Sequence, residues 1–228
     1  MIHDDGYDQA ADVLGGDFQI AHQTVGLRGD GNCAAIASRF PITALHEVDL
    51  QLTPRTRDFP AITLIAEIAA ADPVGPLLFV NHLPSWKPQL ELERELQTVK
   101  AARAVEELAG GRHVVLAGDL DATPDAASIR FLRGRQSLHG ASVHYIDAWA
   151  QAHPGDAGLT FTPDNPLVMQ ETDVTVEEPR RIDYIFVRGG EQGPSLRVGA
   201  CERIFDEPVD RVWASDHFGL VADLEPFA

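Results

Sequence analysis

The chain has 228 residues, of which 44% are hydrophobic and 7% are aromatic, and this composition excludes a disordered, collagen-like or coiled-coil protein. Thirty-five Asp and Glu residues against 18 Lys and Arg residues give a formal net charge of −17. Because nucleic-acid binding draws on Lys and Arg contacts with phosphates, this balance disfavours nucleic-acid partners but does not exclude them.

Targeting and cross-linking signals are weak in this sequence. No apolar run approaches the roughly 20 residues of a membrane span, so we expect no transmembrane segment. The first residues, Met1 to Gly6, lack the basic and apolar parts of a secretory signal. Two cysteines, Cys33 and Cys201, are too few for a disulfide framework. We therefore expect a cytoplasmic protein with a single domain over residues 1–228.

Short apolar runs alternate along the chain with stretches of helical periodicity. The pattern predicts a helix over residues 7–14 and strands over residues 34–38, 62–68 and 77–80. A longer helix is predicted over 89–109, ended by Gly110-Gly111, and a buried strand over 113–117. Thr123-Pro124 is typical of the start of a second helix, and strands follow over 183–187 and 218–224. These elements indicate a mixed α/β fold.

Four polar clusters stand at the ends of predicted strands, where loops commonly carry function. They are Asn81-His82, Asp119 with Asp121, Arg181 with Asp183, and Asp216-His217. Each cluster alone has a structural interpretation: a strand-end histidine bonded to a loop, a pair of turn residues, an ion pair, and a common dipeptide.

Taken together and in this order, the motifs resemble those of the endonuclease/exonuclease/phosphatase superfamily, the DNase I-like phosphoesterases. The matching stretches are 29–42, Asn81-His82-Leu83, the GDxNxxP-like 118–124, RIDYIF at 181–186 and Ser215-Asp216-His217. The resemblance implies two packed β-sheets flanked by helices, a four-layer α/β sandwich.

The resemblance also implies catalytic residues for phosphoester hydrolysis. His217 is expected to be the general base or acid, and Asp183 to fix its tautomer. Asp119 is expected to align or activate the attacking water, and His82 to donate to a phosphoryl oxygen.

Metal-binding and substrate-binding residues follow from the same resemblance. Asp216 is expected to hold Mg²⁺ or Mn²⁺, hard cations that prefer carboxylate ligands, and Asn81 to contact the substrate. Asp121 stands where the family has Asn, and a carboxylate cannot donate to a phosphoryl oxygen. Asp121 must therefore bind a cation, carry a proton or point elsewhere, and our hypothesis is that it is an additional metal ligand beside the substrate.

A second departure concerns the start of the chain. The family begins with a strand carrying Asn and a strand ending in Gln-Glu, and the residues before the 7–14 helix contain neither. We expect a domain that is truncated relative to the family, or a divergent member. A missing strand exposes ladder groups and apolar surface, so self-association that covers the gap is an expectation.

Three functions remain open at this stage. The first is a metal-dependent hydrolase acting on a small or lipid-linked phosphodiester or phosphomonoester. The second is a catalytically impaired binding or scaffold protein of the same fold, and the third is a calcineurin-like metallophosphoesterase. Variable loops around 85–86, 137–144 and 163–178 are expected to select the substrate. For the acidic stretch 163–178 itself, a solvated loop is the favoured interpretation.

Overall fold

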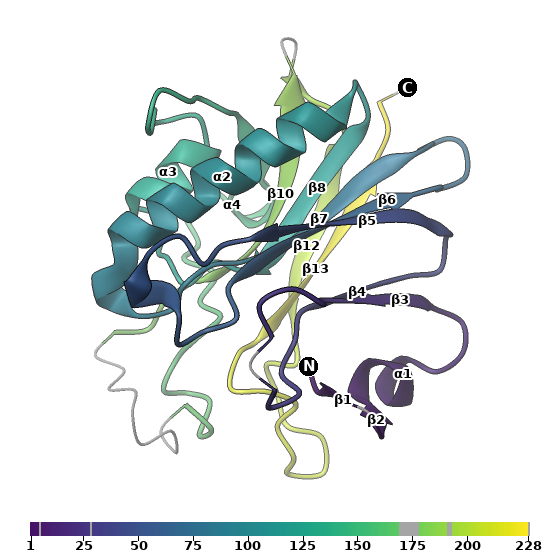
Figure 1. Cartoon of the computed structure of the whole chain (residues 1–228), viewed down its shortest axis with the longest axis vertical. Coiled ribbons are helices and arrows are strands. Elements are labelled where there is room, and N and C mark those ends of the chain that lie inside the picture. The colour runs from purple at the N-terminus through teal and green to yellow at the C-terminus, as the bar shows by residue number, and fades with distance from the viewer. Residues whose placement is uncertain (5, 28, 169–177, 191–192, 228) are drawn as a thin grey trace.

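The computed structural model describes residues 1–4, 6–27, 29–168, 178–190 and 193–227 of the chain (Figure 1). Most of the acidic stretch expected to select substrate, including Glu171, Asp173 and Glu177, lies outside the described residues. Within them, no helix has both the length and the apolar character needed to cross a membrane.

The centre of the fold is a mixed sheet with the strand order β11-β10-β8-β7-β6-β5, to which β9 adds by pairing with β10. Its strands are β5 (Ile42–Asp49), β6 (Ile62–Ile68), β7 (Leu77–Leu83), β8 (His113–Asp119), β9 (Tyr145–Asp147), β10 (Asp183–Gly190) and β11 (Gly193–Pro194). Only β7 and β8 pair in parallel among these described strands, and a helix connects them, as a parallel crossover requires.

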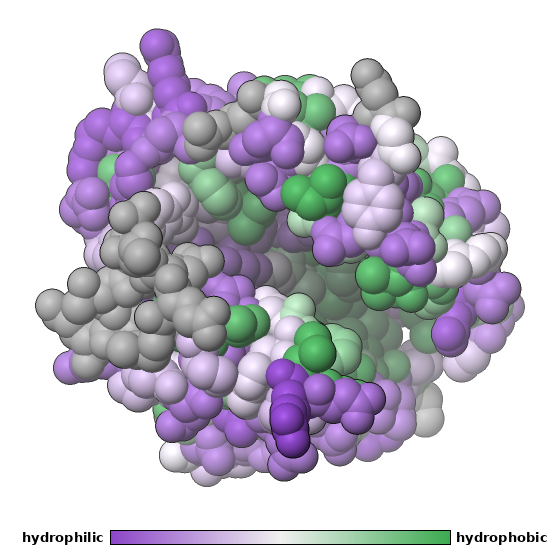
Figure 2. All heavy atoms as spheres, turned by 90° about the horizontal axis from the view of Figure 1, so that it is seen from below, coloured by the Kyte–Doolittle hydropathy of each residue, from purple (hydrophilic) through white to green (hydrophobic). Residues whose placement is uncertain are grey.

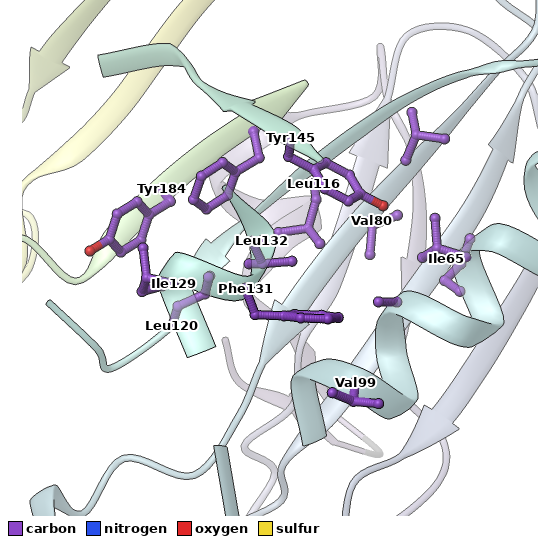
Figure 3. Close-up of a cluster of buried hydrophobic side chains, with 14 of the residues drawn as sticks. Ile65, Val80, Val99, Leu116, Leu120, Ile129, Phe131, Leu132, Tyr145 and Tyr184 are labelled. Atoms are coloured by element: carbon purple, nitrogen blue, oxygen red, sulfur yellow. The ribbon is translucent and has the colours of Figure 1, made fainter. Parts of the chain in front are cut away.

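Helices cover one face of this sheet, where α2 (Glu91–Ala109) and α3 (Ala127–Leu132) pack. Figure 3 shows the resulting core, in which Val99 of α2 and Phe131 of α3 lie among side chains from the strands. Helix α2 ends at Gly110, which has the left-handed φ of 52° that glycine adopts at low cost, as the sequence predicts. Two short 3-10 helices, η1 (Pro54–Thr56) and η2 (Pro88–Leu90), precede α2.

Two hairpins lie on the opposite face and form the second layer of the sandwich. One is β3 (Gln19–His22) with β4 (Ala35–Ser38), and the other is β12 (Arg197–Ile204) with β13 (Gly219–Glu225). Helix α4 (Ala148–Ala152) packs against β10 and β12. The predicted α/β sandwich is confirmed, with the second layer made of two separate hairpins among the described residues.

The chain begins with a small hairpin of β1 (His3–Asp4) and β2 (Tyr7–Asp8), followed at once by α1 (Gln9–Leu14). The side chain of Asp8 caps α1 by accepting a hydrogen bond from the Ala11 backbone N–H at 3.0 Å. The helix predicted over 7–14 is therefore present but begins two residues later.

One helix start was predicted wrongly. Helix α3 begins at Ala127, and the residue before it is Ala126, not Thr123. The Thr123 hydroxyl instead donates to the Asp125 carboxylate at 2.6 Å, within the turn that follows β8. Thr-Pro therefore forms a turn here, which the same residue types also favour.

Candidate active site

A hydrogen-bonded pair, Asp183 and His217, joins the start of β10 to the loop before β13. Oδ2 of Asp183 accepts from Nδ1 of His217 at 3.0 Å, and the two side chains are 19% and 23% exposed. The Asp183 backbone N–H donates to the hydroxyl of Thr160 at 3.2 Å, which fixes the backbone from which the carboxylate projects. None of the described residues bonds Nε2 of His217, so this nitrogen is available to a bound molecule.

Asp119, the last residue of β8, lies directly opposite Asp183 in the sheet. Ligand atoms of Asp119, Asp183 and His217 all lie within 4.8 Å of one another. The close approach of strands β7 and β8 depends on Gly118, because a Cβ at this position of β8 would lie 2.2 Å from the carbonyl oxygen of His82 in β7. Three functional groups predicted from separate motifs therefore converge on one point.

Asp121 follows in the turn after β8 and has a left-handed backbone, with φ of 48°. Its backbone N–H donates to Oδ1 of Asp119 at 3.0 Å, an Asx-type turn that orients the Asp119 carboxylate. The Asp121 carboxylate is close enough to His217 and Asp183 to interact electrostatically with both.

The carboxylates of the site are largely buried, so their negative charge is poorly solvated. Burial, together with the charges of Asp121 and Asp183, raises the pKa of Asp119 well above its usual range. Burial also raises the pKa of Asp121 to about 6. Burial opposes the charged form of His217, but the hydrogen bond that it donates to Asp183 and the charges of Asp119, Asp183 and Asp216 raise its pKa to about 10. The carboxylates therefore favour a positive charge at their centre.

Asp216 lies beside this cluster, in a loop held by a buried asparagine. The Nδ2 group of Asn165 donates to the backbone carbonyls of Ser215 and Asp216, at 2.8 Å and 3.1 Å. The Asp216 carboxylate accepts from the Ser215 hydroxyl at 3.1 Å. Asn165 is fully buried, so its hydrogen bonds hold the loop that carries His217 against the protein interior.

Asn81 and His82 are neighbours in β7 and point to opposite faces of the sheet. Asn81 lies on the face of the second layer, where its Nδ2 donates to the Ala35 carbonyl of β4 at 3.0 Å. It is on the correct face for the predicted substrate contact, which remains a prediction.

His82 lies on the helix face, fully buried, with Nδ1 2.8 Å from the Thr63 hydroxyl and Nε2 3.4 Å from the Thr98 hydroxyl. Burial lowers its pKa to about 3, so the ring is neutral. The prediction that His82 contacts a phosphoryl oxygen is corrected here: in this structure it is a core residue linking β6 to α2.

A cavity of about 770 Å³ opens between the two layers, and Asp119 and Asp183 are among its lining residues. Its floor includes Phe79, Val115 and Ile185 of the main sheet, and its sides come from β4 and β13. Figure 2 shows a hollow in this molecule whose interior is largely hydrophobic, with polar residues around the rim. An apolar group therefore has room beside the acidic cluster.

The donor set of this cluster fits a hard divalent cation. Carboxylate oxygens of Asp119 and Asp183 lie within 4.8 Å of each other and of an imidazole nitrogen of His217, and burial together with the neighbouring carboxylates raises the pKa of Asp119. A cation at this point would offset that negative charge. Asp121 and Asp216 lie outside the group that falls within 4.8 Å, but both interact electrostatically with His217.

Sequence motifs did not single out every residue that builds the site. Phe161 packs against the His217 ring with centroids 4.8 Å apart, and Asn165 holds the loop. Thr160, fully buried, also accepts from the Ile182 backbone N–H at 3.1 Å. The buried ion pair of Arg181 and Asp147, with contacts of 2.9 and 3.0 Å, fixes the chain before Asp183. A Thr-Phe pair in a loop gives no periodic signal by which the sequence pattern could have marked Thr160 and Phe161.

Comparison with known proteins agrees with the family resemblance of the sequence motifs. A sequence model described as the Endonuclease/Exonuclease/phosphatase family matches residues 3–217. No curated protein matches the sequence.

Solved structures share the fold. A humanized D. rerio TDP2 aligns with a TM-score of 0.71 at 17% identity, covering 95% of this chain and 80% of that chain. D. rerio TDP2 complexed with a single strand DNA product aligns with a TM-score of 0.70 at 18% identity, covering 94% of this chain and 79% of that chain. An endonuclease/exonuclease/phosphatase from Bacteroides vulgatus aligns with a TM-score of 0.64 at 19% identity, covering 92% of this chain and 77% of that chain.

Proposed function

Because the chain belongs to the Endonuclease/Exonuclease/phosphatase family, we propose that it is a divalent-metal-dependent phosphoesterase with His217 as its general base and acid. The observation that carries the proposal is the 3.0 Å bond from His217 to Asp183, with Asp119 within 4.8 Å of both. This family match also leaves the calcineurin-like interpretation without support.

The roles of the residues follow from the direction of that bond. Asp183 holds Nδ1–H, so Nε2 of His217 faces the reacting groups. In its neutral form His217 accepts a proton from the attacking water at Nε2, and in its charged form it donates a proton to the leaving oxygen. Proton transfer of this kind contributes roughly 10²–10⁴-fold to rate. Asp119 orients the water, since its carboxylate lies next to the imidazole.

Enzymes of this family generally use divalent metals, and we propose Mg²⁺ or Mn²⁺ for this chain. When bound, the ion supplies positive charge that offsets the phosphoryl oxygens and favours in-line attack by water. Asp119 and Asp183 of the cluster would hold it, with Asp121 and Asp216, which lie outside the 4.8 Å group, as further carboxylates at its edge. The raised carboxyl pKa values of Asp119 and Asp121 support this, because burial disfavours their charged forms and a bound cation would stabilise those forms.

For the substrate we propose a small or lipid-linked phosphodiester or phosphomonoester. The apolar cavity of about 770 Å³ beside Asp119 and Asp183 accommodates a hydrophobic substituent. The net charge of −17 opposes approach of long polyanions, so nucleic acid is the less favoured substrate.

The test is hydrolysis of bis(p-nitrophenyl) phosphate and p-nitrophenyl phosphate with Mg²⁺, with Mn²⁺ and with a chelator. We expect turnover with metal that falls by roughly 10²–10⁴-fold in His217→Ala. The matched control is His46→Ala, because His46 also bonds a carboxylate, that of Glu67 at 3.0 Å, but lies elsewhere. Equal background in all proteins would instead favour a catalytically impaired binding protein of the same fold.

A further inference from the structure

A second cluster of metal-ligating side chains lies in the N-terminal part of the chain. Oδ2 of Asp8 in β2 is 3.0 Å from Nε2 of His22 in β3 and 3.6 Å from Nδ1 of His3 in β1. One ligand atom from each residue lies within 4.8 Å of the other two. This cluster shares no residue with the group formed by Asp119, Asp183 and His217.

The Asp8 carboxylate is oriented by the helix that follows it. Its Oδ1 accepts from the Ala11 backbone N–H and caps α1, which leaves Oδ2 directed at the two imidazoles. The β1–β2 pairing places His3 directly opposite Asp8. Two of the three side chains are therefore positioned by backbone structure.

His22 is held from its other side. Its Nδ1 lies 3.8 Å from Sγ of Cys33, a buried thiol, and its side chain is only 13% exposed. A partner on the second nitrogen fixes the tautomer and the ring orientation of a metal-binding histidine. Cys33 therefore positions His22, and the ligand atom of His22 is Nε2.

We propose that His3, Asp8 and His22 bind one divalent transition-metal ion, with Zn²⁺ as the ion that fits the donors, and water at the remaining position. Two imidazole nitrogens with one carboxylate oxygen form a set that zinc accepts, whereas Mg²⁺ prefers oxygen ligands throughout. The bound ion would tie β1, β2 and the start of α1 to β3.

Binding requires one side chain to move. The His3 and His22 rings are stacked with centroids 4.0 Å apart and an angle of 8° between their planes. Each imidazole lone pair lies in its own ring plane, so two parallel rings cannot both point at one ion. His3 is the ring free to turn, because its side chain is 42% exposed.

Calorimetric titration of the metal-free protein with Zn²⁺ tests this proposal. We expect a binding event, distinct from any at the proposed active site, whose affinity falls at least about tenfold in both His3→Gln and His22→Gln. The matched control is His46→Gln, which should bind like the parent, because His46 has a carboxylate partner but no second histidine in its described contacts. Asp183→Asn separates this event from zinc uptake at the proposed active site and should leave it intact, whatever the outcome of the phosphoesterase assay.

Far-ultraviolet circular dichroism of each variant checks the fold, and the exposed position of His3 makes its variant informative even if His22→Gln is unstable. Parent-like zinc affinity in a folded His3→Gln and a folded His22→Gln would overturn the proposal. So would loss of all zinc binding in Asp183→Asn, since that would assign the ion to the other cluster.

Discussion

At the scale of single residues, the charge state of His217 is set by its neighbours. Burial alone would lower its pKa, but the hydrogen bond that His217 donates to Asp183 and the nearby carboxylates raise it to about 10 from an ordinary 6.5. In the metal-free protein His217 is therefore an imidazolium at neutral pH. A bound cation would compete with this charge for the same carboxylates.

The raised pKa of His217 predicts how the stability of the metal-free protein depends on pH. The folded state binds the proton more tightly than the unfolded state, so the stabilisation is complete below about pH 6.5 and is lost as pH rises through about 10. Urea denaturation across this range should show the fall in the parent and a flatter profile in His217→Gln. Identical profiles would show that His217 is not paired in solution.

Asp121 provides a prediction about metal dependence. If its carboxylate contributes to the ion site, Asp121→Asn should need a higher Mg²⁺ or Mn²⁺ concentration for half-maximal activity than the parent does. Asn tolerates the left-handed φ of 48° at this position, so the turn should survive. A metal titration of activity measures the difference, and an unchanged metal requirement in a folded variant would remove Asp121 from the ion site.

At the scale of elements, the close approach of the parallel strands β7 and β8 controls where Asp119 lies. Gly118 has φ of 152°, and a Cβ there would lie 2.2 Å from the His82 carbonyl. We expect Gly118→Ala to lower the free energy of unfolding by roughly 1–3 kcal/mol and to reduce activity by displacing Asp119.

Urea unfolding and the phosphoesterase assay measure both effects of Gly118→Ala. Gly16→Ala is the control, because nothing lies within 4 Å of a Cβ at that position. Equal stability of the two variants would show that the backbone at Gly118 can relax without cost.

Sequence patterns located the long helix α2 and the strands β6, β7, β8 and β10 of the main sheet because their periodicity reflects burial. Strand β6 matches its prediction, and Asp119, Asp183 and His217 converge as the motif order implies. The face of His82 was not predictable, because adjacent residues of a strand point to opposite faces and both faces of β7 are covered. Strands β5 and β12 were missed, since polar residues interrupt their apolar pattern.

At the scale of the whole molecule, the second layer is open between its two hairpins. Among the described strands, β4 pairs only with β3 and β13 pairs only with β12, and the apolar cavity lies between them. Unpaired strand edges beside apolar surface favour pairing with another chain.

We propose that these edges cause self-association. Light scattering should show a mass that rises with protein concentration, because pairing buries both the edge and the cavity lining. Val221→Lys places a charge at an exposed position of β13, where Val221 is 43% exposed, and should reduce the association. A monodisperse monomer at every concentration would contradict this proposal.

The most direct test of the catalytic pair is a double-mutant cycle on metal-dependent bis(p-nitrophenyl) phosphate hydrolysis, using Asp183→Asn, His217→Gln and the variant with both changes. Since Asp183 acts through His217, we predict that each single change lowers kcat by roughly 10²–10⁴-fold and that the double variant is no slower than His217→Gln. Losses that multiply in the double variant, or full activity in either single variant, would contradict the pairing of these residues in catalysis.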